Sequence, residues 1–281
     1  MSNIGIVGLG YVGTAISKGL EGKFEIETYD KYKKSTCTGL AQLCAITDTI
    51  FVCVPTPMKP SGECDISIVK SVIYELNKYC KDHIIILKST VPPTTTERFN
   101  KDCKQLTIVF SPEFLTEANY INDFIECNRI ILGGPEKSTL HAKNIFLQCF
   151  PNKIYIRTDS TTAEIVKYIG NTFLATKVSF ANEIKQVCDA LNVDYNEVIE
   201  YAKLDSRLGP SHWAVPGPDG NLGFGGSCFP KDINALISLA EEKGLQPKVL
   251  RAAWNKNLEI RPERDWEDLI GRAISKGEKN E

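Results

Sequence analysis

The first half of the chain alternates short, continuous apolar runs with longer segments whose apolar residues recur at helical spacing. Continuous apolar strands are typical of a parallel sheet that helices cover on both faces. Helices are expected between the strands, for example over residues 12–20 and 66–79. The pattern therefore predicts an α/β fold with a doubly wound, mostly parallel sheet. The predicted strands are residues 3–7, 25–29, 49–54, 83–88, 106–110, 129–132 and 153–156.

From about residue 160 the pattern becomes helical. Residues 161–164, Thr-Thr-Ala-Glu, match a capping box, in which the first threonine and the glutamate cap a helix start. Apolar residues then recur at helical spacing, without proline, as far as Leu191, which predicts one long central helix. We predict two domains, residues 1–158 and a mainly helical domain over residues 159–281. Shorter helices are expected from residue 194, over 230–243 and over 249–257.

A loop rich in glycine and proline, residues 206–226, leads into the sequence Gly-Phe-Gly-Gly-Ser-Cys-Phe-Pro-Lys-Asp at residues 223–232. Ordered loops of this length often bind ligands. Cys228 lies between the glycines and the expected first turn of a helix, where converging N–H groups stabilise a thiolate. Cys228 is therefore a candidate nucleophile, and a buried, inert cysteine is the alternative.

Composition narrows the classes of function. The 281 residues are 42% hydrophobic and 24% charged, as in globular proteins, and the formal net charge is −2. This charge provides no basic field for nucleic acid or an anionic membrane. No apolar run reaches the roughly 20 residues that cross a bilayer, and the N-terminus does not resemble a signal peptide. We therefore expect a soluble, cytoplasmic protein.

Cysteine and histidine usage argues against disulfides and metal sites. The ten cysteines are scattered without a Cys-x-x-Cys pair, and several, such as Cys53, lie within apolar runs. Most are expected to be small buried hydrophobic residues in a reducing compartment. We identify no histidine at metal-ligand spacing from a cysteine and expect no zinc site.

A glycine-rich segment at residues 8–13, Gly-Leu-Gly-Tyr-Val-Gly, follows the first predicted strand and opens a helix. In a dinucleotide-binding turn Gly8 permits the tight turn, Gly10 lets the pyrophosphate approach the backbone, and Gly13 permits close helix–sheet packing. Asp30 ends the second predicted strand, where its carboxylate would accept from the adenine-ribose hydroxyls and oppose a 2′-phosphate. This context predicts a Rossmann-type domain that binds NAD; a glycine turn without a ligand is the alternative.

Two further segments end predicted strands, Val-Pro-Thr-Pro at residues 54–57 and Lys-Ser-Thr-Val-Pro at residues 88–92. Ligands of open α/β sheets bind at the carboxyl ends of strands, so these segments are candidates for the nicotinamide side of the crevice. Ordinary turn chemistry is the alternative for each, and the lysines that follow Asp30 leave NADP open. The predicted cofactor-binding residues are Gly8, Gly10, Tyr11, Val12, Gly13, Asp30, Lys31, Val54, Pro55, Thr56, Ser89 and Thr90.

Two pairs of polar residues are four positions apart. Lys167 and Asn171 share one face of the long helix, where a lysine and an amide could stabilise an oxyanion. Glu113 and Glu117 follow a strand, and two carboxylates that repel each other there suggest a site. A solvated helix face is the alternative for both pairs.

Six segments occur in the order in which they occur in the UDP-glucose/GDP-mannose dehydrogenases, a family that this chain closely resembles. The resemblance implies an NAD-dependent, four-electron oxidation of the CH2OH of a sugar nucleotide to a carboxylate, with two NAD and one water consumed. The segments are residues 8–13, 54–57 and 88–92, Ser-Pro-Glu-Phe-Leu-x-Glu at 111–117, Lys167 with Asn171-Thr-Phe-Leu-Ala, and residues 223–232.

The resemblance also implies catalytic roles. Cys228 would attack the aldehyde from the first oxidation, and the thiohemiacetal would become a thioester. Lys167 with Asn171 would stabilise the alkoxide and the tetrahedral oxyanions. Asp232 would hold the lysine or the reacting water. Glu117 resembles the base for thioester hydrolysis and is also expected at the cofactor, with Thr90 assisting through a water.

Substrate contacts and assembly follow from the same resemblance. Arg207 matches an arginine that reaches the substrate across a subunit interface, which implies a homodimer built on the long central helix. Glu113 is the less certain carboxylate and reads as structural. UDP-glucose is favoured over GDP-mannose or a UDP-N-acetylhexosamine. The predicted substrate-binding residues are Phe114, Leu115, Glu117, Lys167, Asn171, Arg207, Phe224, Gly225 and Cys228.

One departure from the family concerns length. Family members continue into a further α/β domain that closes over the nucleotide, whereas few residues follow Asp232 here and residues 251–266 read as the end of the linking helix. The loop at 209–222 or a partner is expected to supply the missing contacts. Two alternatives stay open: a single-step β-hydroxyacid-type dehydrogenase, which needs no cysteine, and a non-catalytic NAD- or sugar-nucleotide-binding subunit.

Overall fold

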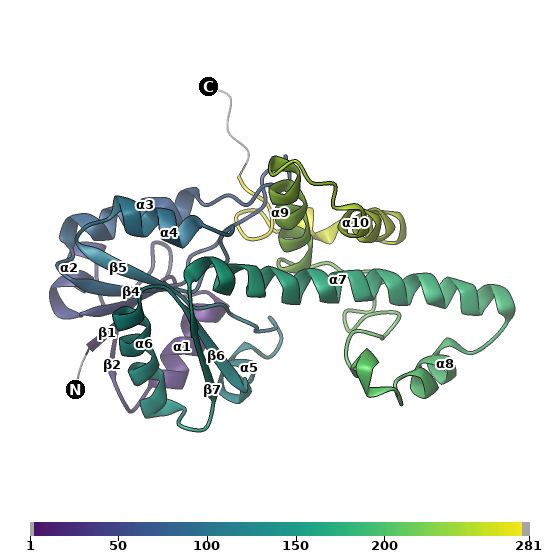
Figure 1. The fold of residues 1–281 in the computed structure, drawn as a ribbon, viewed down its shortest axis with the longest axis horizontal. Coiled ribbons are helices and arrows are strands. Elements are labelled where there is room, and N and C mark those ends of the chain that lie inside the picture. The colour runs from purple at the N-terminus through teal and green to yellow at the C-terminus, as the bar shows by residue number, and fades with distance from the viewer. Residues whose placement is uncertain (1–2, 277–281) are drawn as a thin grey trace. The chain divides into compact units, whose positions relative to one another are not determined.

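The computed structural model describes residues 3–276, so the end of the predicted second domain, residues 277–281, lies outside the described residues (Figure 1). Contacts divide the chain into two compact units. The first unit comprises Met1–Thr56 and Ile66–Lys167, and the second comprises Pro57–Asp65 and Tyr168–Glu281.

The first unit is built on a seven-stranded sheet with the order β2-β1-β3-β4-β5-β6-β7. Neighbouring strands are parallel except β5 and β6, which meet through the antiparallel pair Phe110–Gly133. The predicted doubly wound, mostly parallel sheet is confirmed. The strands are β1 (Asn3–Val7), β2 (Glu25–Tyr29), β3 (Thr49–Val52), β4 (His83–Leu87), β5 (Leu106–Phe110), β6 (Arg129–Gly133) and β7 (Ile154–Thr158).

Helices cover both faces of this sheet, and Figure 1 shows the two sets on opposite sides. In β3, Ile50 and Val52 pack in one apolar cluster with α2, α3 and α4, whereas Phe51 packs in a second cluster with α1, α5 and α6. Alternate residues of a strand point to opposite faces, so a strand buried on both faces is apolar at every position. The helices are α1 (Tyr11–Leu20), α2 (Leu40–Ile46), α3 (Ser67–Tyr79), α4 (Thr95–Asp102), α5 (Tyr120–Glu126) and α6 (Glu136–Cys149).

The second unit is mainly helical, as expected. Its first helix, α7 (Ser160–Leu191), has 32 residues, begins in the first unit and continues into the second after Lys167. The boundary predicted at residue 158 lies just before this helix. The elements that follow are α8 (Tyr195–Ala202), the 3-10 turn η1 (Ser206–Leu208), α9 (Phe229–Glu242), α10 (Lys248–Ile260) and the 3-10 turn η2 (Asp265–Asp268).

A short segment from the first half of the sequence also belongs to the second unit. Met58, in Pro57–Asp65, forms bridges with Cys64 and with Ile274. The backbone N–H of Met58 donates to the carbonyl of Ala273, and the N–H of Ser275 donates back to the carbonyl of Met58, both at 2.8 Å. The segment is therefore held by the C-terminal part of the chain.

The expectation that residues 251–266 form the end of one helix is wrong. α10 ends at Ile260, because Arg261 precedes Pro262 and the residue before a proline is disfavoured in a helix. Trp266 lies instead in η2, where it is buried with its ring centroid 5.2 Å from that of Trp254 on α10. The chain after α10 therefore folds back onto the second unit.

The predicted capping box at the start of α7 is also wrong. Asp159 caps the helix, because its carboxylate accepts from the backbone N–H of Thr162 at 2.8 Å and from its hydroxyl at 2.7 Å. Glu164 is fully buried and accepts instead from the N–H groups of Thr94 at 2.7 Å and Thr96 at 2.9 Å, at the start of α4. Glu164 thus joins α7 to α4 within the first unit.

Glu164 predicts a pH dependence of stability. Burial raises the pKa of Glu164 to about 7, although the N–H donors oppose the shift. Because this pKa lies above that of the unfolded chain, the contribution to stability is full below about pH 4.5 and is lost as the pH rises through 7. Between pH 5 and pH 8, the unfolding free energy of the unmodified protein should fall by about 2 kcal/mol relative to that of Glu164→Gln.

Urea unfolding of both proteins at several pH values measures this difference. Glu136→Gln, which changes an exposed glutamate in the first turn of α6, is the matched control and should follow the unmodified protein at every pH. A free-energy difference between Glu164→Gln and the unmodified protein that stays constant with pH would contradict the assignment.

Candidate functional site

The glycine turn after β1 has the close contacts that a dinucleotide-binding turn requires. Gly8 has a φ of +92°, and a Cβ on it would lie 2.8 Å from the carbonyl oxygen of Cys53. A Cβ on Gly13, inside α1, would lie 1.9 Å from the carbonyl oxygen of Gly8. Gly10 precedes α1, and no atom lies within 4 Å of its Cβ position. The chain itself therefore requires Gly8 and Gly13, whereas Gly10 leaves the helix N-terminus open to a phosphate group.

Asp30 is fixed beside this turn by backbone donors. Its carboxylate accepts from the N–H of Leu9 at 2.7 Å, of Tyr32 at 2.8 Å and of Lys33 at 2.9 Å. Burial alone would raise the pKa of Asp30, but these donors hold it below its ordinary value. The ionised carboxylate can accept from ribose hydroxyls and opposes a 2′-phosphate. Lys31, in contrast, lies with its Nζ 5.7 Å from the ring centroid of Tyr32.

The other predicted cofactor residues lie at the carboxyl ends of β3 and β4 and on α1. The hydroxyl of Ser89 donates to the carbonyl of Val54 at 2.7 Å, which ties the two strand ends together. β1 has β2 on one side and β3 on the other, so the chain reverses its winding direction beside these residues. Of the rest, Thr56 is buried, Thr90 is half-buried, Pro55 is exposed, Val12 packs against the core and the Tyr11 ring contacts that of Tyr120.

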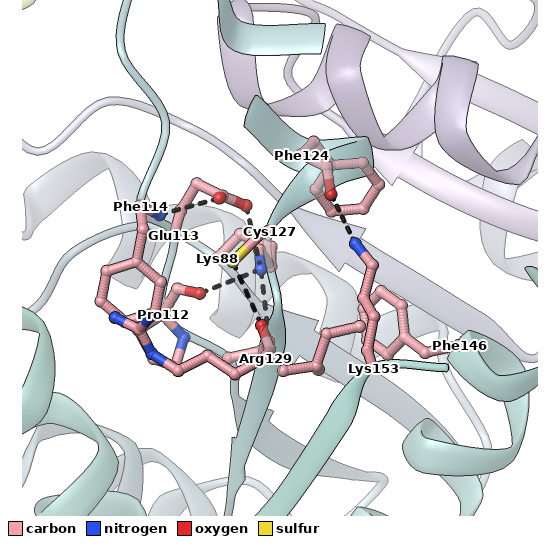
Figure 2. Close-up of a pocket in the computed structure, with 11 residues that line it drawn as sticks. Lys88, Pro112, Glu113, Phe114, Phe124, Cys127, Arg129, Phe146 and Lys153 are labelled. Atoms are coloured by element: carbon pink, nitrogen blue, oxygen red, sulfur yellow. Dashed lines mark hydrogen bonds and ion pairs between the residues drawn. The ribbon is translucent and has the colours of Figure 1, made fainter. Parts of the chain in front are cut away.

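A buried ion pair lies at the end of β4 and β5 (Figure 2). The Nζ of Lys88 is 3.1 Å from Oε2 of Glu113 and donates to the hydroxyl of Ser111 at 3.2 Å. Oε1 of Glu113 accepts from the N–H of Phe114 at 2.8 Å. Glu113 is therefore the counter-ion of Lys88. Glu113 and Glu117 do not share a helix face, because α5 begins only at Tyr120.

The aromatic ring of Phe114 lies near two cations. The guanidinium of Arg129 is 4.5 Å from the ring centroid, and the Nζ of Lys167 is 5.7 Å from it. Both distances lie within the range of cation–π attraction. Lys167, at the end of the first unit, is therefore beside the predicted substrate segment, while Leu115 and Glu117 are half-buried in the turn that follows.

In the second unit, Cys228 is the N-cap residue of α9, as the sequence predicts. The carboxylate of Asp232, in the first turn, is buried and accepts from Nδ2 of Asn171 on α7 at 2.5 Å. Its other oxygen is 2.5 Å from the Nζ of Lys231. The lysine that Asp232 binds here is therefore its own neighbour, which sequence reasoning missed although the two residues are adjacent in the motif.

Lys231 is a permanent positive charge in the first turn of α9. Burial alone would lower the pKa of Lys231, but the adjacent carboxylate of Asp232 holds it above its ordinary value. The helix N-terminus carries positive dipole charge at the same place. Because the carboxylate of Asp232 neutralises the charge of Lys231, it is the helix N-terminus that favours negative charge in a ligand beside Cys228, such as a tetrahedral oxyanion.

Of three other predicted substrate residues, one is exposed, one has its side chain in the core and one is half-buried. Arg207 is exposed and pairs with Asp205 of its own turn. The side chain of Phe224 is buried in the core of the second unit, against Phe229 and Trp254, so only its backbone is available to a ligand. Gly225 is half-buried in the segment before Cys228.

The expectation about histidine spacing needs a correction. Cys80 and His83 are three residues apart, and with Cys44 they place three ligand-type atoms within 4.8 Å of one another. Both ring nitrogens of His83 already have backbone partners at 3.0 Å, in Lys81 and Cys44.

Within the described part of the chain, no helix is long and apolar enough to cross a membrane.

Two family models match most of the chain. The NAD binding domain of the UDP-glucose/GDP-mannose dehydrogenase family matches residues 24–150, and the central domain of the same family matches residues 161–259. The chain belongs to the UDP-glucose/GDP-mannose dehydrogenase family. The first unit carries the NAD-binding domain of this family, and the glycine turn and Asp30 fit that cofactor.

Named relatives agree with this assignment. The chain is 36% identical over 220 residues to a UDP-glucose 6-dehydrogenase of Rickettsia bellii, covering 76% of this chain and 50% of the relative. A UDP-glucose dehydrogenase structure from Pyrobaculum islandicum matches with a TM-score of 0.84 and 28% identity, over 96% of this chain and 70% of that one. The chain thus spans about half the length of the curated relatives it matches.

A structure outside the family shows how general the fold is. The 3-hydroxyisobutyrate dehydrogenase of Mycobacterium tuberculosis matches with a TM-score of 0.75 over 94% of this chain and 95% of that one. At 15% identity this likeness shows the fold alone. Fold alone therefore does not identify the reaction, and the site residues must do so.

The predicted site residues divide between the two units. Lys167 and Phe114 lie together in the first unit, whereas Asn171, Asp232 and Cys228 lie in the second. α7 carries both Lys167 and Asn171 and is the element common to both groups.

The glycine turn predicts different effects for two similar substitutions, one mainly on stability and the other mainly on NAD binding. Gly13→Ala should lower the unfolding free energy by about 2 kcal/mol, because its methyl group overlaps the carbonyl of Gly8. Gly10→Ala should cost at most about 1 kcal/mol of stability but weaken NAD binding at least about ten-fold, because its methyl group points to where the pyrophosphate approaches. Thermal unfolding and calorimetric titration with NAD measure both, and normal NAD affinity in Gly10→Ala would refute the placement.

Proposed function

We propose that this chain carries out the NAD-dependent, four-electron oxidation of a nucleotide sugar, with UDP-glucose the favoured substrate and UDP-glucuronate the product. The observation that carries the proposal is the position of Cys228 as N-cap of α9, with Asp232, Lys231 and Asn171 bound to one another in the adjoining turn. A single-step oxidation of an alcohol needs no such cysteine. Relatives named UDP-glucose 6-dehydrogenase support the choice of sugar nucleotide.

Covalent capture is the proposed role of Cys228. Its sulfur attacks the aldehyde carbon left by the first oxidation and retains it as a thiohemiacetal, which the second oxidation converts to a thioester. NAD, when bound, accepts the hydride in each oxidation. The aldehyde therefore stays attached to the protein between the two steps.

Charge stabilisation is the proposed role of the residues on α7. Lys167 is a buried ammonium, and Asn171 is held by the carboxylate of Asp232, so its amide is oriented before any ligand binds. Preorganised donors of this type stabilise an alkoxide or a tetrahedral oxyanion without reorganisation. Glu117, with Thr90 acting through a water, is the proposed base for thioester hydrolysis. Arg207, Phe114, Leu115 and the backbone of Phe224 and Gly225 are the proposed substrate contacts.

A stoichiometric assay tests the proposal. The purified chain is incubated with NAD and a panel of sugar nucleotides, and NADH is counted per sugar consumed. Two NADH per sugar are expected, because oxidation of the thiohemiacetal to the thioester transfers a second hydride to NAD. One NADH per sugar would favour the hydroxyacid-type reaction, and none at any concentration would favour a non-catalytic binding subunit.

Cys228→Ser identifies the nucleophile in the same assay. Without the thiol no thioester forms, so carboxylate production should disappear while NAD affinity is kept. Cys149→Ser, at the end of α6 in the first unit, is the matched control and should retain two NADH per sugar. Full turnover by the Cys228→Ser protein, with two NADH per sugar, would contradict the proposed mechanism.

A homodimer through α7 is the proposed assembly. Apolar side chains recur along one side of this helix and are exposed in the single chain, with Phe173 exposed by 65%. An apolar stripe of this type is usually covered by a partner. The stripe consists of Ile165, Ile169, Phe173, Phe180, Val187 and Leu191.

Phe173→Glu should weaken the dimer at least about ten-fold, because burying one phenyl ring contributes about 2 kcal/mol. Sedimentation equilibrium over a range of concentrations measures the dissociation constant. Lys137→Glu, an exposed change on α6, is the control and should leave the constant unaltered. A monomeric unmodified chain would rule out the assembly.

A further inference from the structure

The segment Gly223–Gly226, which leads into Cys228, is bound by side chains from α10 and the turn that follows it. Asn257 and Asp265 hydrogen-bond its backbone, and Asn182 on α7 accepts from the N–H of Gly223 at 3.3 Å. Arg261 binds Asp265 and the carbonyl of Leu222, just before the segment. All lie in the second unit.

The side-chain amide of Asn257 makes two hydrogen bonds to the backbone of one residue. It is fully buried on α10, and its Oδ1 accepts from the N–H of Phe224 at 2.7 Å while its Nδ2 donates to the carbonyl of Phe224 at 2.9 Å. A Cβ on Gly223 would lie 2.4 Å from the same Oδ1. The amide therefore replaces the partners that a neighbouring strand would supply, and its loss leaves two buried backbone groups unpaired.

Arg261 binds the residue before this segment and, through Asp265, the residue at its end. Its guanidinium is buried and donates from Nε to Asp265 at 2.6 Å, from Nη2 to Asp219 at 2.7 Å and from Nη1 to the carbonyl of Leu222 at 3.2 Å. Asp265 in turn accepts from the N–H of Gly226 at 3.1 Å. One buried cation thus joins the long loop, the glycine segment and η2.

The glycine segment fits closely against these side chains. A Cβ on Gly225 would lie 2.4 Å from Nη2 of Arg261 and equally near Asp265. The backbone is held by hydrogen bonds at Leu222, Gly223, Phe224 and Gly226 on the approach to Cys228. These contacts fix the path of the chain where it enters α9.

We propose that Asn257 and Arg261 are positioning residues that set the place of the Cys228 thiol through the Gly223–Gly226 segment. The catalytic consequence of this placement rests on the function proposed above. The placement itself is a property of the folded chain and is measurable without turnover.

Alkylation of Cys228 measures the placement. Asn257→Asp removes the donor to Phe224 and keeps the shape, and Arg261→Lys keeps the charge but not the three-way geometry. Loss of a buried hydrogen bond should loosen the segment and raise the rate of iodoacetamide labelling of Cys228 about ten-fold, read by mass spectrometry. Labelling of Cys149, in the first unit, should stay unchanged. Glu259→Gln, an exposed change on α10, is the matched control.

Activity and exchange complete the test. Where the chain is active, the variants should lower kcat with little change in the KM for NAD. In the unmodified protein, the amides of Phe224 and Gly226 should exchange with deuterium as slowly as those of α9. Fast exchange at these amides, unchanged Cys228 labelling in both variants, or faster labelling of Cys149 as well would overturn the proposal. Absent turnover with the labelling result intact would count against the function alone.

Discussion

The carboxylate of Asp232 is the constraint on which the geometry around the nucleophile depends. It is almost completely buried, and each oxygen has one close partner, Nδ2 of Asn171 and Nζ of Lys231, at 2.5 Å. Removing one partner from a buried charge costs about 3–5 kcal/mol, so the three groups hold one another in place. Because Asn171 is on α7 and Asp232 is in the first turn of α9, this contact sets where α9 begins, and Cys228 caps that start.

Other buried charges follow the same rule and join segments that are distant in the sequence. Lys88 and Glu113 pair where β4 and β5 end, and Glu164 on α7 receives the backbone donors at the start of α4. Arg261 binds Asp265 and the loop before the nucleophile. A charged group that is buried away from water must be paired with groups of opposite charge or with hydrogen-bonding partners. These pairings fix loops that apolar packing alone would leave free to move. The loops in question carry the proposed site.

Patterns in the sequence predicted those features of the fold that depend on residues close together in the chain. The strands could be located because burial on both faces makes them apolar at every position, and Cys228 could be placed at a helix start because glycines precede it and a proline follows. Asn257 and Arg261 were not singled out, because their importance comes from partners up to tens of residues away. Lys231 was missed although its partner, Asp232, is the next residue. The helix start at α7 was misread for a related reason: Glu164 was counted as a cap, although a buried partner at Thr94 competes for it.

The glycines before Cys228 can be explained in two ways, by ligand binding and by packing within the chain. From sequence, glycine there indicates close approach of a ligand to the backbone. The structure shows a requirement of the chain itself, since side chains on Gly223 and Gly225 would overlap Asn257 and Arg261. Phe224, between them, turns its ring into the core and leaves its backbone to Asn257. In such a segment a conserved pattern would not by itself separate binding from packing, whereas the contacts of each residue do.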